Sequence, residues 1–188
     1  MAALVGHAMA VVGDTTSVHT AQSNPIGMRA QDADGNTYIY AQGLASLAAG
    51  EWVNIAYNGT TLVTARLLST HSGPVAIAMA AITATTSFGW FQIAGRNSLA
   101  LIASDGTIVS AGGEVQATES LIATVKLAGG DSFGAATGHI YGAWTYSAQP
   151  DTDSAATGTP GTDMAYVYLN FPFMAPKTVG YSSTGASS

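Results

Sequence analysis

Hydrophobic residues alternate with small or polar residues over short segments along most of this chain. Val75, Ile77 and Met79 alternate with alanines, which is the two-residue period of a β-strand. Because the intervening residues are small rather than polar, we predict that both faces of this strand are covered. An alanine-rich run also suits a helix, but the β-branched residues here and the aromatic run at 88–93 favour strands. We expect two buried strands, joined through residues 83–87, at the centre of a β domain.

Asn58 and Gly59 lie between two runs of alternating residues, 51–57 and 60–67. Asn-Gly is a preferred pair for the two-residue type I′ turn, because both central positions require positive φ. We therefore predict a tight hairpin with Asn58 and Gly59 at its tip.

The segment 32–36, Asp-Ala-Asp-Gly-Asn, predicts a second hairpin. It has a superficial similarity to a calcium loop of the EF-hand type. That loop needs a further ligand before its glycine and a glutamate at position twelve, which here is Gly43. We interpret the segment as an ordinary turn.

We expect further strands at 98–103, 107–109, 120–127, 137–146 and 164–171 on the same grounds. Gly95 would end the central pair of strands, and Pro172 would stop the last strand. The strand at 137–146 is notched by glycines. In the last of these, Tyr166, Tyr168 and Asn170 would lie on one face, and Val167, Leu169 and Phe171 on the other.

Eight to ten short strands without a convincing amphipathic helix predict an all-β fold, an antiparallel β-sandwich or barrel-like single domain. Residues 1–27 lack clean periodicity and are interpreted as an extended N-terminal arm. Residues 28–176 form the β-rich domain, and 177–188 a flexible C-terminal tail. The proline- and aspartate-containing segment 149–163 is predicted to be an exposed, mobile loop.

Charged residues make up 9% of the 188 residues, against about 25% in an ordinary soluble domain. A monomer normally keeps its surface hydrated with charge, so we expect this chain to hide surface in an oligomer. The net charge is −6, and the five lysines and arginines do not cluster. Nucleic-acid binding needs several cations that neutralise phosphates, so no nucleic-acid partner is expected.

Cysteine is absent, which excludes disulfides and thiolate metal sites. The apolar start of the chain has no lysine or arginine, so it does not match a secretory signal. No segment reaches the roughly 18–20 continuous apolar residues of a membrane helix. We expect synthesis in the cytoplasm and no membrane partner.

No catalytic, cofactor-binding or metal-binding residues are predicted, because the candidate side chains do not form recognisable groups. The histidines His7, His19, His71 and His139 lack the short spacing of a zinc site. His71 has serines nearby, but no nucleophile elbow is present. Glu51, Glu114 and Glu119 cannot be paired across a cleft by spacing alone. The tryptophans Trp52, Trp90 and Trp144 could form a sugar platform if exposed, but each lies in an apolar strand, which favours core packing.

Several of these runs together resemble the head decoration (cement) and similar capsid-associated structural proteins of tailed bacteriophages. The resemblance rests on Gly-x-Val-Ala-x-Ala-Met-Ala at 73–80 and Gly-Trp-Phe-Gln-Ile-x-Gly at 89–95. It extends to the runs 34–40, 47–53 and 166–173, and covers residues 26–175.

The resemblance implies a non-enzymatic virion protein on the outer surface of the capsid, made in the host cytoplasm. Its partners would be the major capsid protein and copies of itself, expected to form a trimer. A carbohydrate- or receptor-binding β module is the alternative, and exposed Trp or Tyr would distinguish it. A hydrolase would require converging polar residues that the sequence does not locate.

Overall fold

The computed structural model describes residues 10–102, 112–117, 125–127, 138–146 and 164–174. This part of the chain is all-β, as predicted, and contains no helix. The strands are β1 (Ala10–Val11), β2 (Arg29–Gln31), β3 (Thr37–Gln42), β4 (Trp52–Tyr57), β5 (Leu62–Arg66), β6 (Gly73–Ala78), β7 (Phe88–Leu101), β8 (Glu114–Ala117), β9 (Val125–Leu127), β10 (His139–Thr145) and β11 (Met164–Met174). The predicted segments 107–109 and 149–163 and the predicted tail 177–188 lie outside the described residues.

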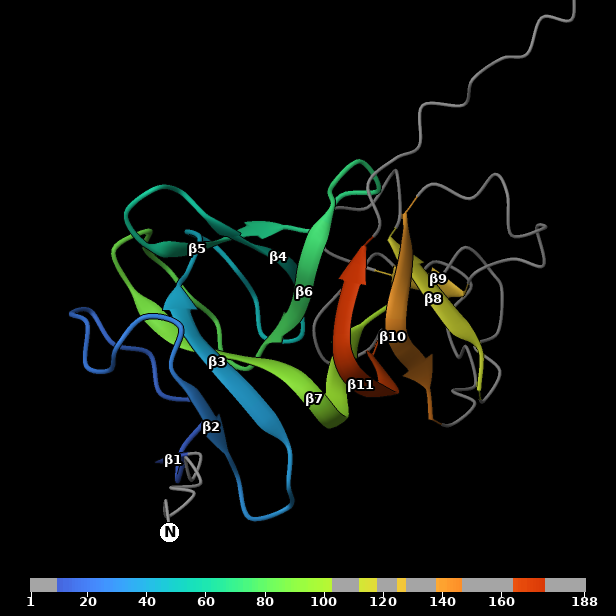
Figure 1. The fold of residues 1–188 in the computed structure, drawn as a ribbon, viewed down its shortest axis with the longest axis horizontal. Helices are drawn as coiled ribbons and strands as arrows, with labels where there is room; N and C mark the ends of the chain where they lie inside the picture. Colours follow the sequence, from blue (N-terminus) through green and yellow to red (C-terminus); the bar gives the residue numbers. More distant parts are fainter. Residues whose placement is uncertain (1–9, 103–111, 118–124, 128–137, 147–163, 175–188) are drawn as a thin grey trace, which may run out of the picture.

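Strands β3 to β7 pair in a closed, barrel-like ring in the order β3-β5-β4-β6-β7 and back to β3 (Figure 1). All neighbours in the ring are antiparallel except β3 and β5, which are parallel. The parallel closure is short: Gln42 pairs with Val63, and the Thr64 hydroxyl donates to the carbonyl of Gln42 over 3.2 Å. The sheet is therefore mixed and not purely antiparallel.

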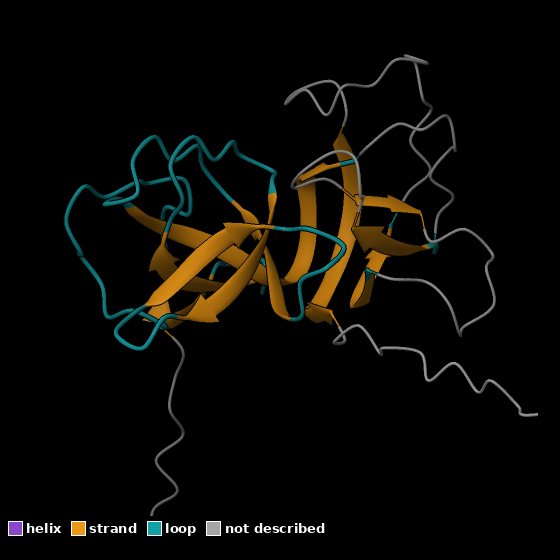
Figure 2. Cartoon of the chain, turned by 90° about the horizontal axis from the view of Figure 1, so that it is seen from above, coloured by secondary structure: helices purple, strands orange, loops and turns teal. Residues whose placement is uncertain are grey.

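The 14 residues of β7 extend beyond the ring into a second group of strands. The second half of β7 pairs with β11, which pairs in turn with β10, and the order continues through β8 to β9. Figures 1 and 2 show these two groups of strands side by side, with β6 and β7 between them. One long strand thus holds both parts of the sheet together.

β6 separates two hydrophobic cores, one on each face. Ala76 and Ala78 face the inside of the ring, where they pack in the same cluster as Phe91. Val75 and Ile77 face the other way and pack in a cluster with residues of β10 and β11. The prediction that both faces of this strand are covered is confirmed, and so is the predicted pairing of the two central strands.

Residues 10–27 are extended, but they pack on the domain itself. β1 pairs in parallel with β2, and His19 forms a bridge with Phe88 of β7. Val12 and Ile26 pack against the buried cluster that contains Tyr40 and Trp90. The sequence predicted an arm outside the core over residues 1–27; the described part of it belongs to the sheet, because these apolar side chains cover the outer face of β3 and β7.

Gly95 does not end the central pair as predicted. The strand passes through it and continues to Leu101, so 98–101 is not a separate strand. The φ of Gly95 is +98°, and the backbone changes direction there without losing its partners: Gly95 pairs with Leu169 and Arg96 with Tyr168. Glycine adopts this positive φ without steric cost, so it fits inside a continuous strand as readily as in a turn.

The last strand also differs from its prediction at its end. Tyr166, Tyr168 and Asn170 are exposed as expected, but Phe171 has a φ of +48° and is exposed as well. The strand runs on through Pro172 to Met174. Proline is tolerated because residues 170–172 lie opposite Gly142 in a bulge between β10 and β11, where no ladder hydrogen bond is needed. In the glycine-notched strand, Gly142 thus marks a bulge.

The β4–β5 hairpin forms as predicted, but its turn is not the type I′ turn of Asn58 and Gly59. Among the described non-glycine residues only Ser46 and Phe171 have positive φ, so Asn58 does not meet the type I′ requirement. The Asn58 side-chain oxygen instead accepts hydrogen bonds from the backbone N–H groups of Thr60 and Thr61. This capping interaction places Asn58 at the start of a longer loop between Tyr57 and Leu62.

Candidate functional site

The turn at residues 32–36 is held together by the carboxylate of Asp32. Its Oδ1 accepts hydrogen bonds from the backbone N–H groups of Asp34 and Asn36, both over 2.9 Å. Its Oδ2 accepts from the Asn36 amide over 2.8 Å and from the Tyr38 hydroxyl over 2.6 Å. The segment is the ordinary hairpin turn that the sequence predicted, with Asp32 directed at its own backbone.

These contacts shift two pKa values. Partial burial alone would raise the pKa of Asp32, but the hydrogen bonds from Tyr38, Asn36 and the backbone hold it below its usual value. Burial and the adjacent Asp32 carboxylate raise the pKa of Tyr38 above that of an ordinary tyrosine. The contribution of Asp32 to stability is therefore present at neutral pH and is lost as the pH falls below the usual aspartate range of about 4.

The raised pKa of Tyr38 gives a testable pH dependence. Tyrosine in an unfolded chain ionises near pH 10, whereas folded Tyr38 does not, so the stability that Tyr38 adds is present below about pH 10 and declines above it. Tyr38→Phe should cost about 1.5–3 kcal/mol at neutral pH, because a hydrogen bond to a charged group is lost. The stability difference between wild type and variant should shrink when urea unfolding is repeated at about pH 11. Tyr57→Phe is the control, because it removes a tyrosine hydroxyl elsewhere in the protein. The prediction is contradicted if the stability difference between wild type and Tyr38→Phe is the same at neutral pH and at about pH 11.

The turn is fixed against β7 at Gly95. The side-chain oxygen of Asn36 accepts a hydrogen bond from the backbone N–H of Arg96 over 2.9 Å. A Cβ at position 95 would lie 2.1 Å from that same oxygen, so only glycine allows the close approach. This contact sets the position of the turn relative to the second group of strands.

An open cleft of about 830 Å³ lies between this turn and the strands β10 and β11. Asp34 and Asn36 line one side, and Tyr146, Tyr166 and Tyr168 line the other. We call this cleft the tyrosine cleft. The Arg96 guanidinium, which also lines it, lies 4.6 Å from the centre of the Tyr146 ring. Outside this lining, the Arg29 guanidinium lies 5.5 Å from the centre of the Phe171 ring.

A buried polar network forms the floor of the tyrosine cleft. The Gln92 amide donates to the carbonyls of Ala94 and Arg96, and its oxygen accepts a hydrogen bond of 2.7 Å from Asn97. Gln92 and Asn97 are both buried. Because the donors of Gln92 are used internally, the network fixes the shape of β7 at its bulge.

A second aromatic surface lies on the same strands, at the bulge of residues 170–172 and immediately after it. It consists of Tyr141, Phe171 and Phe173, each 45–50% exposed, and we call it the aromatic patch. The rings of Tyr141 and Phe173 are stacked, with their centres 5.3 Å apart. Exposed aromatic side chains that cluster in this way are typical of contact surfaces.

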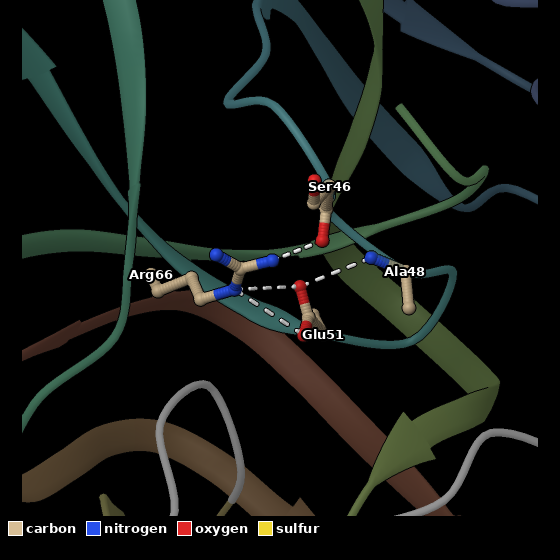
Figure 3. Close-up of polar contacts among 4 residues, drawn as sticks. All are labelled: Ser46, Ala48, Glu51 and Arg66. Carbon is tan, nitrogen blue, oxygen red and sulfur yellow. Dashed lines mark hydrogen bonds and ion pairs between the residues drawn. The ribbon is translucent and has the colours of Figure 1, made fainter. Parts of the chain in front are cut away.

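A partly buried ion pair joins the start of β4 to the end of β5 (Figure 3). The Arg66 Nε lies 3.2 Å from the Glu51 Oε2, and the same carboxylate accepts a hydrogen bond from the Ala48 backbone. A terminal nitrogen of Arg66 donates to the carbonyl of Ser46, whose φ is +60°. Glu51 thus has a structural partner and faces no second carboxylate in the described part of the chain.

The three histidines in the described part of the chain have different partners. His19 Nδ1 is 3.1 Å from the Tyr40 hydroxyl, and His71 Nδ1 accepts the backbone N–H of Leu68 rather than a serine hydroxyl. His139 Nδ1 lies 3.8 Å from the Glu114 carboxylate, and within the described residues its buried Nε2 has no partner. His7 and Glu119 lie outside the described residues. In the part of the chain that is described, no three histidine, aspartate or glutamate side chains group as metal ligands.

Two of the three tryptophans pack in the core, as predicted. Trp52 is fully buried and donates its indole N–H to the carbonyl of Leu101 over 3.1 Å, and Trp90 is 5% exposed. Trp144 differs: it is only partly buried and lies against Tyr168, with ring centres 6.0 Å apart. The alternation along the last strand places Tyr166 and Tyr168 on one face, but no local pattern marks the tyrosines of the cleft as a site. Their meeting with Asp34 and Asn36 depends on strand register.

Comparison with protein-family models, curated proteins and solved structures gave no match. No helix that could span a membrane occurs within the described ranges.

Proposed function

We propose that this chain is a non-enzymatic structural protein of a tailed-bacteriophage virion. In this role it binds the outer surface of the assembled capsid and stabilises the shell. Its partners are the major capsid protein and further copies of itself, as a homo-oligomer that we expect to be a trimer. The sequence resemblance motivates this proposal, and the aromatic patch is the observation on the structure that supports it.

The aromatic patch suits a protein contact. Tyr141, Phe171 and Phe173 expose apolar area on a chain in which only 9% of residues are charged. Aromatic side chains are enriched in the centres of protein interfaces, and lysine and glutamate are depleted there. Burying such rings against a partner contributes roughly 25 cal/mol for each Å² of apolar surface removed from water.

The proposed mechanism is thermodynamic linkage. A protein that binds the assembled shell, and not its dissociated subunits, shifts the equilibrium toward the shell by mass action. No reacting group is needed for this effect. Each bound copy adds contacts that bridge neighbouring shell subunits, and an oligomer multiplies those contacts through a raised effective concentration.

Binding to isolated shells tests this proposal. Shells of the phage that encodes the chain, prepared without it, should bind the wild-type protein and become more resistant to heat. The double variant Tyr141→Ala/Phe173→Ala should bind at least about tenfold more weakly, because aromatic side chains at the centre of an interface carry much of its binding energy.

Tyr57→Ala is the matched control, since Tyr57 is 69% exposed at the tip of the β4–β5 hairpin, outside the aromatic patch. Its affinity for shells should equal that of the wild type. Wild-type protein that does not bind the shells would refute the proposed function. A double variant that binds like the wild type would show that the aromatic patch is not the contact. Light scattering of the free protein measures the expected oligomer.

A further inference from the structure

We propose that the tyrosine cleft binds an uncharged oligosaccharide. This inference goes beyond the capsid role and does not depend on it, because it uses different residues. The cleft lies between the turn at 32–36 and the strands β10 and β11, and its volume of about 830 Å³ is within the range of roughly 300–1,000 Å³ found for small-molecule sites.

One wall of the cleft is aromatic. Tyr146, Tyr166 and Tyr168 are each 45–53% exposed, and all three line the cleft. Sugar rings present C–H groups on their faces, which pack against aromatic rings, and hydroxyls at their edges. Tyrosine matches both features, because it combines a flat apolar face with a hydroxyl that donates and accepts hydrogen bonds.

The opposite wall is polar and supplies partners for sugar hydroxyls. Asp34 is exposed, and no described residue donates a hydrogen bond to its carboxylate. A free carboxylate accepts hydrogen bonds from the neighbouring hydroxyls of a sugar, a charge-assisted interaction stronger than a neutral one. Glycans therefore fit this wall better than an apolar ligand does.

The charge of the lining points to a neutral ligand. Among the described residues that line the cleft, Asp34 is the one acid and Arg96 is the one fixed cation. Since their formal charges cancel, the cleft does not select strongly for an anion such as a sialylated or sulfated glycan, nor for a cation. Neutral sugars with several adjacent hydroxyls are the ligand class that this lining fits.

The cleft is also preformed, which favours binding. Its floor is the hydrogen-bonded pair Gln92 and Asn97, and the turn is fixed to β7 by the contact of Asn36 with Arg96. Trp144 lies against Tyr168, with ring centres 6.0 Å apart, and limits the orientations of that tyrosine. Walls that are already ordered lose less conformational entropy when a ligand binds.

Titration with a panel of neutral oligosaccharides tests this inference. Maltohexaose, cellohexaose, chitohexaose and a galactose-containing oligosaccharide would be added to the full-length protein. The readouts are calorimetry and intrinsic tryptophan fluorescence, to which Trp144 contributes beside Tyr168. At least one of them should bind with saturation below about 10 mM. Tyr166→Ala and Tyr168→Ala should each weaken that binding by at least about tenfold. Asp34→Ala should weaken it as well.

Conservative variants separate ring stacking from general damage to the fold. Tyr166→Phe keeps the ring and should retain most of the affinity. Tyr57→Ala, an exposed tyrosine outside the cleft, should leave it unchanged. The inference is overturned if no oligosaccharide of the panel binds, or if the alanine variants of Tyr166 and Tyr168 bind one as the wild type does. Because the shell-binding variants change Tyr141 and Phe173, either proposal can fail while the other stands.

Discussion

Replacing Phe91 by Ala is expected to lower the free energy of unfolding by about 3–5 kcal/mol. Phe91 is fully buried inside the ring formed by β3 to β7, where it pairs with Ile39 of β3 on one side and with Ala78 of β6 on the other. The neighbouring interior residues Ala76 and Ala78 are too small to fill the cavity that the ring of Phe91 would leave. A loss of this size is a large part of the roughly 5–15 kcal/mol that stabilises a typical domain.

Phe173→Ala is the matched control for this prediction, because it makes the same chemical change on a side chain that is 48% exposed. Its effect on the isolated protein should be clearly smaller, about 0.5–1.5 kcal/mol, because it loses the stacking on Tyr141 but leaves no cavity in the core. Urea unfolding followed by circular dichroism measures both variants. If Phe91→Ala unfolds at the same urea concentration as the wild type, Phe91 does not stabilise the core inside the ring of strands.

Gly95→Ala is expected to lower the free energy of unfolding by about 2–4 kcal/mol. The estimate combines a strained positive φ, at about 1–2 kcal/mol, with the loss of the Asn36–Arg96 hydrogen bond and displacement of the turn. The new Cβ would lie 2.1 Å from the Asn36 oxygen and 2.8 Å from its Cα, so backbone as well as side chain must move. Since the turn forms one wall of the tyrosine cleft, the same substitution should abolish oligosaccharide binding.

Gly35→Ala isolates the contribution of the backbone conformation. Gly35 lies in the same turn with a φ of +83°, but a Cβ there meets nothing within 4 Å. Its cost should be only about 1–2 kcal/mol, from the strained φ alone. Thermal unfolding of the two variants side by side gives the comparison. If Gly35→Ala and Gly95→Ala lower the stability equally, the contact between Gly95 and Asn36 does not contribute to stability.

The two proposed surfaces follow from a single irregularity in β11. Before the bulge at residues 170–172, the exposed side chains Tyr166 and Tyr168 face the turn at 32–36 and line the cleft. After it, the positive φ of Phe171 shifts the alternation by one residue, and Phe171 and Phe173 become exposed instead. Without the bulge, Phe171 and Phe173 would follow Val167 and Leu169 toward the buried face, and no aromatic patch would exist.

Local patterns in the sequence were sufficient to predict an all-β chain and several of its strands, including the two central ones. The alternation of alanine with Val75 and Ile77 correctly indicated a strand that is buried on both sides. The Asp-Gly segment at 32–36 was correctly interpreted as a hairpin turn. These features depend on neighbours two to five residues away, so the information that determines them is contained in the segment itself.

Features that depend on distant partners could not be predicted in this way. Gly95 has the same appearance in the sequence whether it ends a strand or lies within one, and contacts with distant segments, among them Asn36, 59 positions earlier, decide between them. The φ of Phe171 is likewise set by the bulge opposite Gly142. At Asn58, the capping of Thr60 and Thr61 by its side chain overrode the preference of Asn-Gly for a type I′ turn.

The sequence by itself therefore determined an all-β chain, its charge-poor surface and the side-chain alternation of its central strands. The tertiary structure alone decided the closed ring, the continuation of β7 into a second group of strands, and the meeting of Tyr166 and Tyr168 with Asp34 in one cleft. The physical reason is that alternation specifies which face of a strand is apolar, whereas strand order and register are set by hydrogen bonds and packing between segments far apart in the chain.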